Sequence, residues 1–101
     1  MKEQLHEIHN AINNIFEYNI GSYKNYKILV EKALELIRMI PEDSNAMLKS
    51  WKTMAMDELQ KELNGRLSDK FVLLSPDAQK TELKFSKMAA SVVLMNIIMH
   101  L

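Results

Sequence analysis

The chain has 101 residues, of which 48% are hydrophobic, and its 13 lysines and arginines balance 13 aspartates and glutamates. This length and composition fit a single helical domain over residues 1–101 and exclude an intrinsically disordered chain. The absence of cysteine excludes disulfides, thiolate metal sites and cysteine nucleophiles. Because no apolar signal segment follows Met1, we expect a cytoplasmic protein.

Helix-interrupting residues divide the chain at Gly21, Pro41, Gly65 and Pro76. The first segment carries apolar residues at helical spacing, from Leu5 to Ile20, and is predicted to be a helix that Gly21 terminates. Ser22 is expected to cap a second helix, which ends before Pro41 because proline lacks the backbone N–H that a helix needs.

The third helix is expected to begin at a cap formed by Ser44 or Asp43 and to end at Asn64 and Gly65. The apolar run 71–74 predicts a short helix. Ser75, Pro76 and Asp77 combine a capping hydroxyl, a proline at the first helical position and an acid near the positive end of the dipole. A long last helix is predicted from there toward residue 101.

All segments read as helical, which predicts an all-α fold: a compact bundle of four long helices plus one short helix, with short antiparallel connections. The tyrosines at positions 18, 23 and 26 lie on both sides of Gly21. We expect them to pack the corner between the first two helices.

The last helix is apolar on two sides. Spacings of three and four place a row on one face that suits packing inside the bundle, namely Ala78, Thr81, Phe85, Met88, Val92, Met95 and Met99. At about 100° per residue, a second apolar set lies on nearly the opposite face. Either the other helices surround this helix, or another chain covers its second face.

The second face is therefore the predicted partner-binding surface. Ile28 and Met39 on the second helix are eleven positions apart and lie away from its main stripe, and we expect them to belong to the same partner-binding surface. The predicted partner-binding residues are Leu83, Ala90, Leu94, Ile97, Ile98, Leu101, Ile28 and Met39. Seven methionines besides Met1 favour an adaptable surface, although methionine also fills gaps in protein cores.

Catalytic chemistry is not indicated. His6 and His9 could face one metal ion with Glu3, but two imidazoles do not make a site, and we expect two partly exposed polar histidines. The acidic pairs on the third helix, such as Glu58 with Glu62, are expected to form a solvated, ion-paired face. We predict no enzyme activity, no metal and no cofactor.

The predicted function is a non-enzymatic interaction module, of adaptor, inhibitor or chaperone type. It would self-associate, as a homodimer, or bind a partner helix. The alternative is a small helical nucleic-acid-binding regulator, because Lys80, Lys84 and Lys87 lie close together. Nucleic acid is the less favoured partner, since the net charge alternates in sign along the chain and no segment is strongly basic. A membrane span is not expected, because the apolar run 88–101 is too short.

Overall fold

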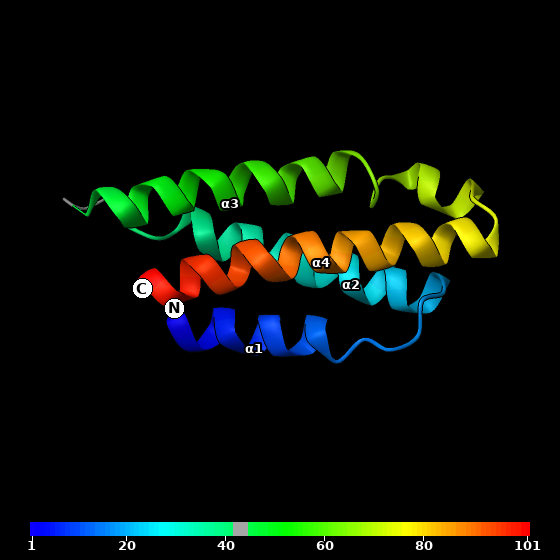
Figure 1. Ribbon diagram of the computed structural model, residues 1–101, viewed down its shortest axis with the longest axis horizontal. Helices are drawn as coiled ribbons and strands as arrows, with labels where there is room; N and C mark the ends of the chain where they lie inside the picture. The colour runs from blue at the N-terminus through cyan, green and yellow to red at the C-terminus, as the bar shows by residue number, and fades with distance from the viewer. Residues whose placement is uncertain (42–44) are drawn as a thin grey trace.

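The chain is all-α. The computed structural model describes residues 1–41 and 45–101, and within them it contains helices and no strand (Figure 1). This confirms the predicted fold class. In chain order the elements are α1 (Lys2–Asn13), α2 (Ile20–Arg38), α3 (Ala46–Asn64), the short 3₁₀-helix η1 (Asp69–Leu73) and α4 (Pro76–His100).

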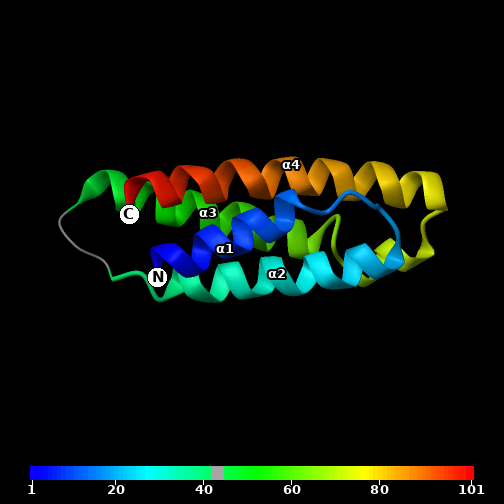
Figure 2. The same cartoon turned by 90° about the horizontal axis from the view of Figure 1, so that it is seen from below.

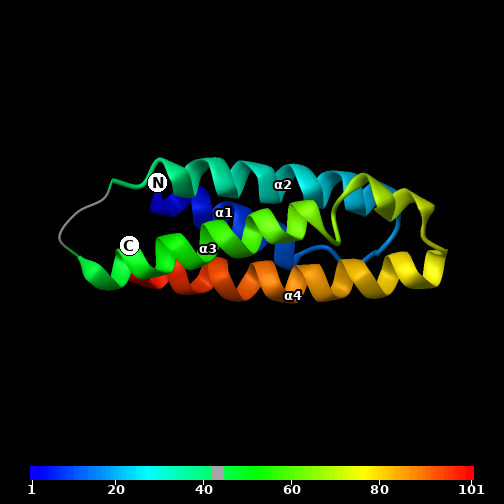
Figure 3. The ribbon, with the colours of Figure 1, turned by 90° about the horizontal axis from the view of Figure 1, so that it is seen from above.

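The four α-helices run lengthwise through a bundle of 46 × 22 × 17 Å, each antiparallel to the helix before it. Figures 2 and 3 place α2 and α4 at opposite edges of the bundle, with α1 and α3 between them. The helix α4 therefore packs mainly against α1 and α3. One whole side of this long helix faces away from the rest of the molecule.

The first helix is shorter than predicted. It ends at Asn13, and an irregular segment, residues 14–19, leads to α2. The cap of α2 is Asn19 and not Ser22, because Asn19 Oδ1 accepts a hydrogen bond from the backbone N–H of Ser22 at 3.0 Å. The predicted stop at Gly21 is wrong, since this glycine lies in the first turn of α2. Asparagine favours caps over helix interiors, which explains both differences.

The boundaries of the later helices agree better with the predictions from the sequence. Gly65 follows the end of α3, η1 forms where a short helix was predicted, and the Ser75 hydroxyl caps α4 by accepting from the N–H of Ala78 at 3.2 Å. The expected caps Asp43 and Ser44 lie outside the described residues. The described start of α3 has Asn45 as its cap, whose Oδ1 accepts from the N–H of Leu48 at 3.1 Å.

The core lies between all four α-helices and includes two residues from the η1 region, Leu67 and Phe71. Two tyrosines of α2 join distant segments rather than the corner after α1. Tyr23 stacks on Phe71 with ring centroids 3.9 Å apart, and its hydroxyl donates to the carbonyl of Leu67 at 2.8 Å. The Tyr26 hydroxyl lies 3.0 Å from Ser86 Oγ of α4. The predicted packing of the α1–α2 corner is therefore wrong for both rings.

Candidate interaction surface

An apolar row runs along the outward side of α4. Its members are separated by three, four, three and four residues and lie about half a turn away from buried positions such as Ala90 and Leu94. Their exposed fractions range from 41% at Met95 to 70% at Met99. We call this set the outer row, and it consists of Phe85, Met88, Val92, Met95 and Met99.

This finding reverses the predicted roles of the two faces of α4. The row predicted to pack inside the bundle is exposed, and most of the predicted partner residues are in the core of a single subunit. The buried residues are Leu83, Ala90, Leu94, Ile97 and Ile98. The alternative in which other helices surround α4 is also wrong, because its outer row remains accessible. Hydropathy could not choose between two faces that are both apolar.

The remaining predicted partner residues are exposed, but they do not form a continuous surface. Ile28 and Met39 of α2 are 62% and 64% exposed, and Leu101 is 38% exposed. Between Ile28 and Met39, the outward side of α2 carries charged residues, among them Glu31 and Glu35. From Met88 onward the outer row of α4 has no such interruption, since residues 88–101 contain no aspartate, glutamate, lysine or arginine.

Basic residues line one edge of the outer row. Lys87 Nζ donates to the carbonyl of Ile15 at 2.8 Å, and Lys84 Nζ lies 5.4 Å from the centre of the Tyr18 ring. Within residues 1–41 and 45–101, neither lysine forms an ion pair. An open pocket of about 450 Å³ lies beside this edge, bounded on the row side by Met88 and Val92.

A polar network beneath the same edge joins α1 to α4. The Ser91 hydroxyl donates to Asn13 Oδ1 at 2.9 Å and lies 3.2 Å from His9 Nε2. Asn13 Nδ2 lies 3.3 Å from each of the two ring nitrogens of His9, so that the three side chains form one hydrogen-bonded group. The expectation of a partly exposed His9 is wrong, since the side chain is buried.

The environment of His9 opposes protonation. Burial lowers the pKa of His9, the charge of the neighbouring His6 lowers it further, and a hydrogen bond with the backbone of Ser91 acts in the opposite direction. The two histidine rings are 6.4 Å apart in an edge-to-face arrangement. The part of the chain that the structure describes has no group of three or more metal-ligating side chains.

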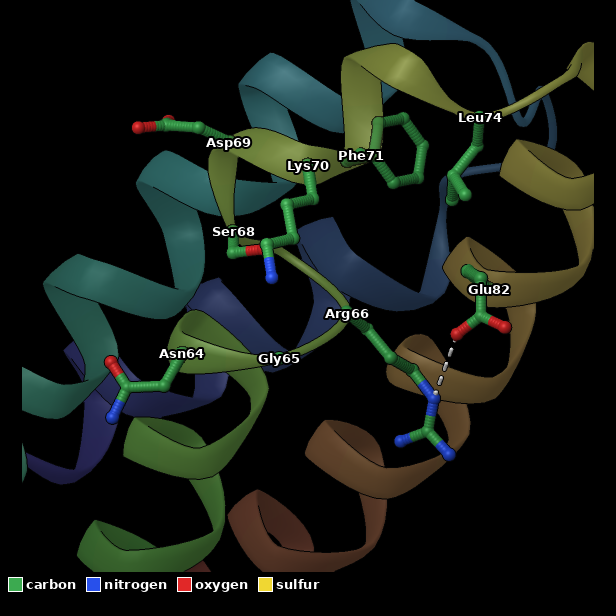
Figure 4. Close-up of a pocket in the computed structure, with 9 residues that line it drawn as sticks. All are labelled: Asn64, Gly65, Arg66, Ser68, Asp69, Lys70, Phe71, Leu74 and Glu82. Atoms are coloured by element: carbon green, nitrogen blue, oxygen red, sulfur yellow. Dashed lines mark ion pairs between the residues drawn. The ribbon is translucent and has the colours of Figure 1, made fainter.

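A second pocket, of about 530 Å³, lies where the turn after α3, η1 and the start of α4 meet (Figure 4). Arg66 extends across it toward Glu82, with Nε 3.4 Å from Glu82 Oε2, while Asp69 points away. The same guanidinium pairs with Glu62 at 2.7 Å. Two carboxylates therefore neutralise Arg66, and the lining residues include neither histidine nor cysteine to act as a base or nucleophile.

The side chain of Glu62 corrects another expectation. It was predicted on a solvated face, but it is 2% exposed and turns toward the interior. Trp51 is partly buried against the core, with its ring 5.6 Å from that of His100. No helix in the described ranges is long and apolar enough to cross a membrane.

The exposure of the outer row is contrary to the prediction from the sequence, which placed this row inside the bundle. A usable signal was its composition, because three of its five members are methionine, whereas the buried face is mostly leucine, isoleucine and alanine. Comparison of the chain with protein-family models, with curated proteins and with solved structures gives no match.

Proposed function

We propose that this protein is a non-enzymatic interaction module that binds an amphipathic helix, from a protein partner or from a second copy, on the outward side of α4. The outer row carries this proposal, because it is continuous, exposed and free of charged residues from Met88 onward. Its three and four spacing is that of helix pairs whose side chains interlock. Soluble proteins that expose such patches generally use them for binding.

The methionines of the outer row suit this role. An unbranched thioether side chain adapts its shape to the helix that packs on it, and methionine is frequent on surfaces that accept varied helical ligands. The neighbouring pocket beside Met88 and Val92 offers room for one larger side chain of the incoming helix. Lys84 and Lys87 would lie at the polar rim of the contact.

A nucleic-acid-binding role is less well supported. Affinity for a duplex depends on many phosphate contacts, and the first half of α4 supplies three neighbouring lysines, Lys80, Lys84 and Lys87. One of them already donates to a backbone carbonyl and packs over aromatic rings. The apolar row beside these lysines has no use in phosphate binding.

Selection from a displayed library of helical peptides tests the proposal. Selected peptides are expected to repeat apolar residues at three and four spacing. Their affinity should fall at least about 10-fold for Val92→Glu, because the substitution places a charge in the centre of the contact. The matched control is Ile28→Glu, an equally exposed apolar position on α2. Ligands that bind both variants as well as the parent protein would contradict the proposal.

A further inference from the structure

We infer that the natural occupant of the outer row is a second copy of this chain, packed as an antiparallel pair of α4 helices with Val92 at the two-fold axis. The inference rests on the proposed function and specifies the partner. It depends on the area of the row, on the distribution of charge along α4 and on the symmetry of the row about Val92.

The area is sufficient for a pair. With exposed fractions between 41% and 70%, the outer row leaves on the order of 500 Å² of apolar surface in water, which is near the upper end for the largest patch of a monomer. Complete contact between two such rows would bury roughly 1,000 Å², the least area expected of a specific interface, which suits a weak dimer. Phe16, 78% exposed, lies beside Lys87 at one end of the row and adds to this area.

The charge distribution selects the antiparallel arrangement. The first turns of α4 carry Asp77, Lys80 and Lys84, whereas residues 88–101 carry no aspartate, glutamate, lysine or arginine. A parallel pair would press the charged halves of both copies together. An antiparallel pair overlaps only the two outer rows, so that the turn carrying Asp77 and Lys80 extends beyond the contact into water while Lys84 lies at its rim.

The spacing of the row fits this symmetry. Phe85 and Met99 are each seven residues from Val92, so that Phe85 of one copy faces Met99 of the other. Val92 faces itself across the axis. No charged side chain meets its own copy in this arrangement, and the basic edge, Lys84 and Lys87, lies beside the uncharged end of the opposing helix.

Sedimentation velocity tests the pairing. The protein is expected to be mainly dimeric at about 100 µM, as suits an interface near the lower size limit. Val92→Glu should weaken the dimer about 100-fold, because two carboxylates would meet at the axis. Ile28→Glu should leave it unchanged. Circular dichroism should show unchanged helicity for both variants, since both positions are exposed.

Cysteine cross-linking tests the direction, and the natural absence of cysteine makes each introduced thiol unique. Val92→Cys should form a disulfide with itself under mild oxidation. Phe85→Cys and Met99→Cys should each form no self-disulfide alone and should form a mixed disulfide when combined, because a disulfide requires closely spaced Cα atoms. Efficient self-linking of Phe85→Cys would instead show a parallel pair and overturn the inferred geometry.

The two proposals fail separately. A protein that stays monomeric, yet binds selected helical peptides on α4, would overturn the second-copy inference and leave the interaction role intact. A dimer that Val92→Glu does not weaken would overturn the inference, because its contact lies elsewhere. A monomer whose selected ligands ignore Val92→Glu would overturn both.

Discussion

Glu62 is a carboxylate that the fold removes from water and leaves only half satisfied. Its Oε2 pairs with Arg66, while its Oε1 has no hydrogen-bond partner among the described residues. A charge in such a place is tolerated only while its counter-ion remains, because an uncompensated buried carboxylate is far costlier than an exposed one. The pair ties the end of α3 to the turn that follows it.

Replacing Arg66 should therefore destabilise the protein substantially. We expect Arg66→Met to lower the free energy of unfolding by about 2 to 4 kcal/mol, toward the lower part of the range for buried pairs because the guanidinium is partly exposed. Urea unfolding measures this change. The control Glu82→Gln removes only the longer, exposed contact and should cost less than about 1 kcal/mol. Equal effects of the two substitutions would contradict the role assigned to Glu62.

His9 should make stability depend on pH. Its pKa is lowered in the folded protein, so that the unfolded chain binds the proton more readily, and stability should be complete above the unfolded value of about 6.5 and fall as the pH drops below it. Protonation would also make both ring nitrogens donors, so that neither could accept from Asn13 Nδ2. Thermal unfolding between about pH 5 and pH 8 measures the effect.

The variant His9→Gln should remove most of this dependence, while His6→Gln, at an exposed position of α1, should retain it. The opposite pattern would show that another group titrates in this range.

The sequence did not reveal either buried polar residue, because His9 and Glu62 resemble their exposed neighbours in type. The partner of His9, Ser91, is distant in the sequence, and the partner of Glu62, Arg66, is only four residues away but does not by itself indicate burial.

At the scale of the element, α4 has two apolar faces that should respond differently to truncation. Leu94→Ala removes a fully buried side chain and should cost about 2 to 5 kcal/mol. Val92→Ala, on the outer row, should change the free energy of unfolding of the monomer by no more than about 0.5 kcal/mol. Urea unfolding, at a protein concentration well below that at which the dimer forms, compares the two variants. Similar costs at both positions would mean that the outer row is covered within one subunit.

Element types could be read from the sequence more reliably than their ends. Ser75 with Pro76 marked the start of α4 because capping is a local interaction between neighbours in the chain. The end of α1 was misplaced because Gly21 was treated as a stop, while Asn14 and Asn19 supplied the actual end and the next cap. The stacking of Tyr23 on Phe71 holds η1 against α2, and contacts between segments so distant in sequence leave no periodic signal.

At the scale of the whole molecule, the bundle followed from four apolar stripes and short connections, and the all-α prediction was confirmed on those grounds. The interaction surface did not follow in the same way. Both faces of α4 are apolar, so hydropathy alone does not tell which face is buried. Burial of one face depends on how α1 and α3 pack against the side of α4 that carries Ala90 and Leu94. Ala90 and Ser86 are both fully buried, and the Ser86 hydroxyl contacts Tyr26 of α2.

The methionine side chains of the outer row make the proposed association sensitive to oxidation. Mild peroxide treatment should convert the exposed Met88, Met95 and Met99 to sulfoxides, which are polar and poorly suited to an apolar contact. We expect the oxidised protein to sediment as a monomer with its helices intact, and the triple substitution of these methionines by leucine to resist the treatment. Mass spectrometry would follow the added oxygen atoms. An oxidising environment would thus release the subunits from one another without unfolding them.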